Sequence, residues 1–228
     1  MQDLHDRRIL HRDISVPNIM ITTGGGGYLI DLDTARDKDY VGAMQVVRTV
    51  RLYSRNSFWV PDQLTYVRMF HSTWQYMSTR LLTEPGKAHE LCDDIQSLWF
   101  VLLYEALHFV KHNEPPEINM DILFNYVWLS PGTGIHTGGL GKRDFYGFGR
   151  AMMTQTLSFN TVPFTGLIRQ VYALFRNLYE YHGRLANGEK DRTGPIFESA
   201  GKLDSCLEIQ RLFREALTRK GGQRPATK

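Results

Sequence analysis

The sequence predicts an α+β fold that is mainly helical and carries one small β-hairpin near the amino terminus. In the second half of the chain, apolar residues recur at helical spacing, most clearly over 91–110. In the first half, two short apolar runs flank four consecutive glycines. A hydrophobic content of 42% over 228 residues is enough for one sizeable core.

The hairpin is expected from residues 19–21 and 28–30, which are rich in β-branched and large apolar side chains. Residues 24–27 are all glycine and would supply the positive φ angles of the connecting turn. A phosphate-binding loop is not expected there, because such a loop needs a preceding strand, a following helix and usually a lysine. Residues 1–10 are predicted to be the end of a helix.

Four helices are expected after the hairpin. The first occupies 91–110 and is buried on most sides, and the run Glu114-Pro115-Pro116 would end it. The other three are expected at 142–157, at 165–181 with His182-Gly183 as its carboxyl-terminal cap, and at 203–217. Irregular structure is predicted for 36–90, 129–141 and 183–201.

The run His11-Arg12-Asp13 carries the chemistry of the chain. Asn18 follows five positions after Asp13, and Asp31 follows a predicted strand. This is the spacing of a protein-kinase catalytic loop and its metal-binding aspartate. In phosphoryl transfer from ATP, Asp13 would accept the proton of the attacking hydroxyl, while Asn18 and Asp31 would offer oxygen ligands to Mg²⁺.

The chain resembles the fungal-type protein kinase domain family of the protein-kinase-like superfamily. The resemblance runs from about residue 4 to about residue 110, and four features carry it: Ser15 after the His-Arg-Asp run, Asp31-Leu32-Asp33 after the second strand, the run 72–78, and the helix start at 89–99. It implies the carboxyl-terminal lobe of a kinase that transfers the γ-phosphate of ATP, with Mg²⁺, to a hydroxyl of a protein substrate, with serine or threonine as the expected acceptor.

The resemblance also implies roles for three supporting residues. Asp94 would hold the backbone of the catalytic loop, with His11 and Arg12 as structural support, and His11 is expected to pack and hydrogen-bond inside the loop. A buried carboxylate needs such partners. Asp93 and Asp94 could equally cap the amino terminus of their helix, and both interpretations can hold together.

Three departures from the family pattern concern the context of this loop. Only ten residues precede His11, so no glycine-rich loop and no strand lysine come before it. Arg80 stands where the glutamate of Ala-Pro-Glu is expected, which puts the docking of that segment in question. Arg80 also follows Asp31 by 49 positions, which is a long activation-type segment.

The expected domain is therefore a kinase-like lobe over 1–218, with a catalytic loop at 9–35, an activation-type segment at 36–90 and a helical part at 91–218. Residues 219–228 are a basic tail that we expect to be disordered. Whether the chain is an active enzyme stays open at this point. The alternative is an inactive, truncated kinase lobe, a pseudokinase candidate that acts as a binding module or is a gene fragment.

Composition limits the expected partners and location. A net charge of +3 gives no case for nucleic acid or membrane partners, and it does not indicate an oligomeric state. Without a cysteine framework or a secretory signal, an intracellular location, cytoplasmic or nuclear, is expected. The histidines are not expected to bind metal: His108 and His112 are four apart, but Phe109 stands where the zinc-protease motif has its glutamate.

Overall fold

The structure is a computed structural model that describes residues 1, 4, 6–37, 74–84, 86–113, 120–125, 127–129, 136–147, 156–190 and 192–219. Within these residues the fold is mixed and mainly helical, so the predicted α+β class is confirmed at this level. The helices are α2 (Thr79–Thr83), α3 (Leu91–Phe109), α4 (Leu140–Gly147), α5 (Val162–Ala186), α6 (Pro195–Gly201) and α7 (Leu207–Thr218). A 3₁₀ turn, η1 (Val16–Asn18), and a π-helical turn, η2 (Asp121–Asn125), complete the helical elements of the described part.

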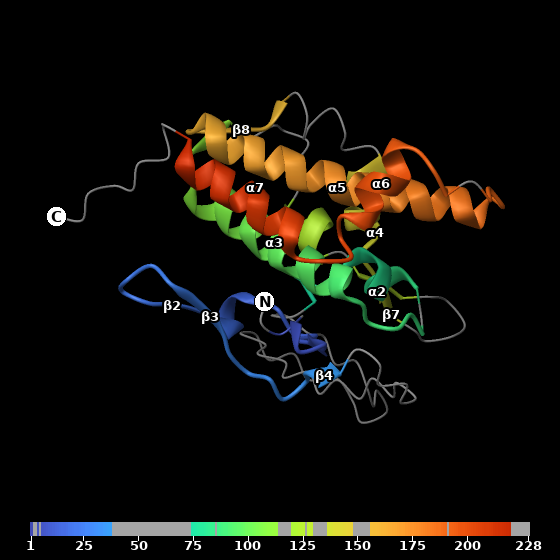
Figure 1. The fold of residues 1–228 in the computed structure, drawn as a ribbon, viewed down its shortest axis with the longest axis horizontal. Helices are drawn as coiled ribbons and strands as arrows, with labels where there is room; N and C mark the ends of the chain where they lie inside the picture. The colour runs from blue at the N-terminus through green and yellow to red at the C-terminus, as the bar shows by residue number, and fades with distance from the viewer. Residues whose placement is uncertain are drawn as a thin grey trace.

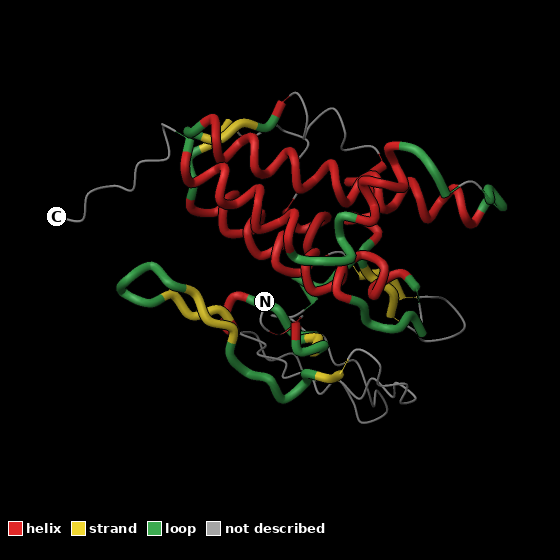
Figure 2. Tube along the Cα trace, in the orientation of Figure 1, coloured by secondary structure: helices red, strands yellow, loops and turns green. Residues whose placement is uncertain are grey.

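The strands form four separate antiparallel pairs of two strands each within the described residues. The pairs are β1 (Ile9–Leu10) with β4 (Arg36–Asp37), β2 (Ile19–Ile21) with β3 (Gly27–Leu29), β5 (His112–Asn113) with β8 (Ser158–Phe159), and β6 (Val127–Leu129) with β7 (His136–Gly138). Each pair is short, so the helices provide most of the regular structure, as the colours of Figure 2 show.

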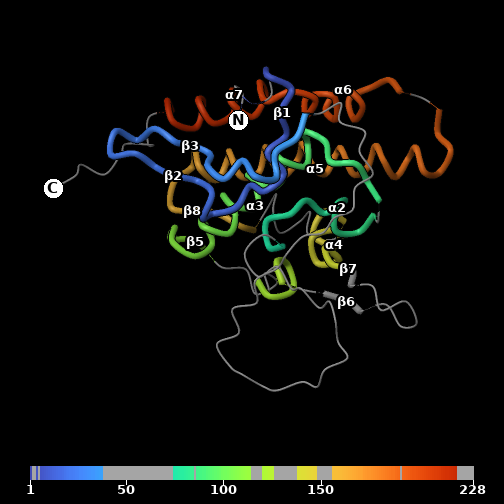
Figure 3. Tube along the Cα trace, turned by 90° about the horizontal axis from the view of Figure 1, so that it is seen from below, coloured from blue at the N-terminus to red at the C-terminus, as the bar shows by residue number. Residues whose placement is uncertain are grey.

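Helices α3, α5 and α7 form a layer, and the β2–β3 hairpin lies beneath it together with the amino-terminal segment (Figure 1). Seen from below, this amino-terminal part of the chain passes across α3 and α5 (Figure 3). Helix α5 is the common packing partner, because it contacts α3, α4, α6 and α7.

An aromatic cluster between α3, α4 and α5 forms the centre of the core. Trp99 of α3 is 2% exposed, and its ring lies within 6.5 Å, centroid to centroid, of five other aromatic rings. These rings belong to Phe100, Phe145, Tyr146, Tyr172 and Phe175. Buried aromatic side chains of this size dominate the packing free energy of a core. The cluster holds α3 in place, and α3 in turn positions the candidate site.

The hairpin and the central helix are confirmed with shifts of one residue. Strand β3 occupies Gly27–Leu29 rather than 28–30, and the Ile30 amide donates to the carbonyl of Asn18, which belongs to the 3₁₀ turn η1. The glycine turn contains Gly25 at φ 78°, in the left-handed region that glycine favours. Helix α3 ends at Phe109, one residue before the predicted boundary, and the expected stop at 114–116 lies outside the described residues.

The prediction of a helix end over 1–10 is wrong at its last two residues. Ile9 and Leu10 form strand β1, paired with Arg36 and Asp37 of β4. This pairing joins segments that are far apart in the sequence, which local pattern does not reveal. It also places regular structure at the start of 36–90, and α2 adds a short helix near its end; residues 38–73 lie outside the described part.

The boundaries predicted for the later helices need correction. Helix α4 runs from Leu140 to Gly147, and residues 148–155 are not described. Thr156 is helical and Leu157 precedes strand β8, so the predicted end at 157 is one residue late. The predicted loop at 129–141 contains β7 and the start of α4, and it overlaps the end of β6. Helix α7 begins at Leu207 rather than at 203. Of the tail, only Arg219 is described.

The expected carboxyl-terminal cap of α5 at Gly183 is wrong. The helix continues to Ala186, and Gly188, with φ 83°, reverses the chain after it. One reason is the ion pair between Arg184 and Glu180, 2.9 Å apart one turn away, which supports the extra turn. The predicted loop at 183–201 then folds partly into α6, whose Ser199 accepts a hydrogen bond from Asn177 of α5 at 2.9 Å.

Candidate functional site

The Asp94 carboxylate, at the start of α3, holds the backbone of the loop at residues 11–18. Its Oδ2 accepts the His11 amide at 2.7 Å, and its Oδ1 accepts the Arg12 amide at 3.0 Å. His89 contributes a third contact, with its Nε2 2.8 Å from Asp94 Oδ1. Asp94 is 2% exposed, so three partners compensate the burial of its charge. The loop therefore has a fixed position relative to α3.

The His11 side chain is part of the loop interior, at 1% exposure. Its Nε2 lies 3.1 Å from the Ile30 carbonyl, and its Nδ1 accepts the Asp13 amide at 3.4 Å. These partners assign the proton of a neutral ring to Nε2. The His11 carbonyl accepts the Thr34 hydroxyl at 3.0 Å. His11 thus connects the loop to the segment that follows the hairpin.

Asn18 is joined to Asp13 and to the neighbour of Asp31. Its Nδ2 donates to the Asp13 carbonyl at 2.9 Å, and its own carbonyl accepts the Ile30 amide at 3.0 Å. Because the amide nitrogen is used, Oδ1 is the remaining polar atom of the Asn18 side chain. The predicted site residues therefore come from two ends of one hairpin: Asn18 precedes β2, and Asp31 follows β3 and is exposed.

Two residues of the site have left-handed backbone conformations. Arg12 has φ 68° and Asp31 has φ 63°. Such conformations are uncommon outside glycine and concentrate at functional sites. Burial lowers the pKa of Arg12, and the nearby Arg36 lowers it further, while the Asp94 charge acts in the opposite direction.

The segment 74–79 is fixed by contacts that the sequence does not predict. Ser78 donates to Asp93 Oδ1 at 2.6 Å, and the Thr79 amide donates to Gln96 Oε1 at 3.0 Å. From α4, Nζ of Lys142 donates to the carbonyl of Met77 at 2.7 Å. Lys142 is 1% exposed, and this burial lowers its pKa well below the ordinary lysine value.

Arg80 holds the segment in place although the expected glutamate is missing. This residue of α2 donates to both carboxylate oxygens of Glu84 at 2.9 Å and contacts His182 Nε2 of α5 at 2.8 Å. Burial disfavours the charged form of Arg80, but Glu84 and the nearby Glu90 outweigh this effect and raise its pKa. Arg80 therefore connects α2 to α5 as a cation, in place of a glutamate.

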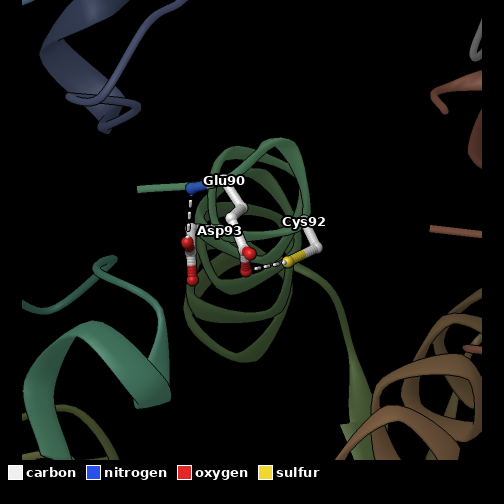
Figure 4. Close-up of side chains that lie close together, drawn as sticks. All are labelled: Glu90, Cys92 and Asp93. Carbon is white, nitrogen blue, oxygen red and sulfur yellow. Dashed lines mark hydrogen bonds between the residues drawn. The ribbon is translucent and has the colours of Figure 1, made fainter. Parts of the chain in front are cut away.

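A second group of acidic and sulfur side chains lies beside the site. Glu90, Cys92 and Asp93 bring one ligand atom each to within 4.8 Å of one another, and they form the one such group among the described residues (Figure 4). Asp13 and Asp31 do not belong to it. The ammonium of Lys87 lies 2.9 Å from Glu90 and 2.6 Å from Asp93, so a lysine already supplies the cation. Burial raises the pKa of the Cys92 thiol, which disfavours the thiolate that a metal would need.

The hairpin exposes large apolar side chains next to Asn18 and Asp31. Met20 and Tyr28 are opposite each other in the ladder and are 54% and 64% exposed. Ile30 and Leu32 continue the exposed apolar surface toward and beyond Asp31. An exposed apolar surface of this kind indicates a binding surface.

The remaining sequence expectations concern metal and membranes. His108 and His112 make local contacts, with Nδ1 2.8 Å from the carbonyls of Tyr104 and Val110 respectively. In the described residues, no helix combines the length and the hydropathy that a membrane span requires.

Comparison with known proteins identifies the amino-terminal part of the chain. Residues 1–106 match the family model described as fungal protein kinase. No curated protein and no solved structure matches the chain significantly. The matched residues include the loop at 11–18, Asp31 and Asp94. Residues 1–106 therefore carry a domain of the fungal protein kinase family.

Proposed function

We propose that the chain is a protein-kinase-like phosphotransferase that transfers the γ-phosphate of ATP to a hydroxyl of a protein substrate. Asp13 accepts the hydroxyl proton, and Asn18 and Asp31 are the residues that would hold Mg²⁺. The observation that carries the proposal is the Asp94 carboxylate, which fixes the loop through two backbone amides at 2.7 and 3.0 Å. A loop that is ordered before substrate arrives does not have to be ordered during the reaction.

The residues present suit a magnesium ion. Mg²⁺ prefers oxygen ligands, and a site of this type uses one or two side chains together with substrate phosphates. The hydrogen bond from Asn18 Nδ2 to the Asp13 carbonyl leaves Oδ1 for a cation, and Asp31 offers an exposed carboxylate. When bound, the ion would neutralise charge that develops on the phosphates. Asp13 and the loop backbone do the proton transfer and the positioning.

The apolar surface of the hairpin supports a nucleotide ligand. Met20 and Tyr28 are exposed. Met20 lies on β2, which Asn18 precedes, and Tyr28 lies on β3, which is followed by Ile30 and Asp31. A purine base has a flat apolar face that packs on such side chains, while its phosphates reach the polar end of the hairpin. In this arrangement one element would contact both parts of ATP.

Magnesium-dependent ATP binding tests the proposal. We expect isothermal titration calorimetry to show binding of ATP to the wild type in the presence of Mg²⁺, and no magnesium dependence in the Asp31→Ala variant. Asp33→Ala is the matched control, since it removes an exposed carboxylate two positions away. Binding that is absent from the wild type, or unaffected by Asp31→Ala, contradicts the proposal.

A second candidate function is a noncatalytic kinase lobe that acts as a binding module. The exposed apolar surface at Met20, Ile21 and Tyr28 favours it, because a partner protein could cover the same side chains. The two candidates differ in their dependence on Asp13. Transfer of radiolabelled phosphate to a mixture of peptides, abolished by Asp13→Asn, supports the enzyme. Magnesium-dependent ATP binding without any transfer supports the module.

A further inference from the structure

Asp31 lies in the connection between strand β3 and strand β4. Its φ is 63°, a left-handed backbone conformation that residues other than glycine seldom adopt. Residues 31–33 are exposed, so burial of their side chains does not impose this conformation. A conformation of this kind persists where the surrounding structure fixes the chain. The contacts on the two sides of Asp31 therefore decide where its carboxylate lies.

On the amino-terminal side, Ile30 is fixed through both of its backbone polar groups. Its amide donates to the carbonyl of Asn18 at 3.0 Å, and its carbonyl lies 3.1 Å from Nε2 of His11. The residue before Asp31 is thus attached to the loop that also carries Asp13.

On the carboxyl-terminal side, the side chain of Thr34 makes the corresponding contact. Its hydroxyl donates to the carbonyl of His11 at 3.0 Å. The ladder of β1 with β4 begins two residues later, at Arg36. In the described part of the chain, the Thr34 hydroxyl provides the hydrogen bond that joins residues 31–35 to the loop at residues 11–18.

Both contacts end on His11, which is a rigid anchor. Its ring contacts the carbonyl before Asp31, and its own carbonyl accepts the hydroxyl after it. His11 is 1% exposed, and its amide donates to the buried carboxylate of Asp94 at 2.7 Å. Nδ1 of the same ring accepts the amide of Asp13. One buried residue therefore fixes Asp31 relative to Asp13.

We infer that Thr34 is a positioning residue of the candidate site. Its hydroxyl holds the chain after Asp31 against His11, and so keeps the Asp31 carboxylate in a fixed place relative to Asn18. The inference rests on the proposed function, in which Asn18 and Asp31 would hold Mg²⁺. Because Mg²⁺ demands a near-ideal arrangement of its ligands, a displaced carboxylate binds it more weakly. Thr34 acts through Asp31 and does not itself contact the ion or the nucleotide.

Thr34→Val tests the role of the hydroxyl, because valine keeps the branched shape of the side chain and removes the donor. In calorimetry with the full chain, the magnesium concentration that gives half-maximal ATP binding should rise about fivefold. Affinity for ATP in the absence of Mg²⁺ should stay within about twofold of the wild type. Thr34→Ser keeps a hydroxyl and should return the magnesium dependence to within about twofold of the wild type.

Thr218→Val is the matched control. Thr218 is an exposed threonine at the end of α7, and its hydroxyl also donates to a backbone carbonyl at 3.0 Å. This substitution should leave the magnesium dependence unchanged. An equal change in Thr34→Val and Thr218→Val would contradict a role that is specific to the site.

Two results distinguish positioning of Asp31 from a purely structural role of Thr34. The Ala35 amide donates to the Leu32 carbonyl within the same connection, and its hydrogen exchange should become faster in Thr34→Val but not in Thr34→Ser. Unchanged exchange would show that the hydroxyl does not hold this part of the chain. A lower melting temperature together with an unchanged magnesium dependence would show that Thr34 only stabilises the fold, and either result overturns the inference.

The wild type separates this inference from the proposed function. If the wild type shows no magnesium-dependent ATP binding, the proposed phosphotransferase fails, and the positioning role fails with it. If the wild type binds and Thr34→Val has the same magnesium dependence, only the positioning role fails. An equal loss in Thr34→Val and Thr34→Ser also overturns that role, because the hydroxyl would then not be the group responsible.

Discussion

The Asp94 carboxylate lies 2.7 Å from the backbone nitrogen of His11, although the two residues are 83 positions apart in the chain. This contact makes the first turn of α3 the support of the loop at residues 11–18. The contribution of Asp94 to the free energy of unfolding can be measured directly, because Asp94 is buried and its partners are known.

Replacement of Asp94 by alanine should lower the free energy of unfolding by about 3 kcal/mol, since three buried hydrogen-bonding groups lose a charged partner. Urea denaturation followed by circular dichroism measures the change. Asp144→Ala, at a side chain 56% exposed, is the control and should change the value by less than about 0.5 kcal/mol. Equal effects of the two substitutions would show that the hydrogen bonds of Asp94 contribute nothing to stability.

Two glycines of α4 should respond in opposite ways to alanine. A Cβ at Gly141 would lie 1.9 Å from the Ile122 carbonyl oxygen, so Gly141→Ala should destabilise the protein by about 2 kcal/mol or more. A Cβ at Gly147 would meet no atom of the described residues within 4 Å, and Gly147→Ala should be neutral or stabilise by up to about 1 kcal/mol. Thermal denaturation of the pair tests the close approach of α4 and η2; similar melting temperatures would contradict it.

The stability of the protein should fall in weak acid partly because of His182. Burial and the neighbouring Arg80 lower the pKa of His182 in the folded state. Near neutral pH the side chain is uncharged in both states, and its contribution is complete. As the pH falls below the ordinary value of about 6.5, the unfolded chain takes up the proton first, so folding loses stability.

His182→Gln keeps an acceptor for Arg80 and removes the titration. Its melting temperature should therefore fall less than that of the wild type between about pH 7 and about pH 5. His108→Gln, at an exposed histidine of α3, is the control and should follow the wild type. Parallel curves for His182→Gln and the wild type would rule out a role for His182 in this pH range.

Lys142 should make the protein relatively more stable as the pH rises toward the ordinary lysine pKa. Its pKa is lowered by burial, so in this range the unfolded chain binds a proton that the folded chain does not. The difference in unfolding free energy between the wild type and Lys142→Met should grow in favour of the wild type from about pH 7 to about pH 10. Lys202→Met, at a side chain 52% exposed, should show no such trend.

The sequence predicts those parts of the fold whose residues specify them locally. The periodic apolar positions of α3 and the glycine run of the hairpin gave boundaries within one residue of the structure. The sequence does not predict helix α6 because its seven residues are too few to show a helical period, and its packing against α5 provides the stability. Gly183 looked like a cap, but the ion pair of Arg184 with Glu180 extends the helix past it.

The candidate site likewise has one part that the sequence predicts and another part that it does not. The spacing of Asp13, Asn18 and Asp31 is a property of one continuous segment, and it could be recognised from the sequence alone. The partners of Lys142 are carbonyls more than sixty positions earlier, and a lysine in a predicted amphipathic helix is normally exposed. The contact of Arg80 with His182 spans 102 positions. A sequence pattern read over a short window does not indicate contacts between residues so far apart in the chain.

Asp93 and Asp94 are neighbours on one turn of α3, yet they hold different segments: Asp93 accepts Ser78, and Asp94 accepts His11. Successive residues of a helix project about 100° apart, so the geometry of a single turn fixes the distance and direction between the two segments. The connection between them therefore does not set their relative position. A change in the length of that connection should therefore leave the loop in place, whereas one residue added between the two aspartates would rotate one segment away from the other.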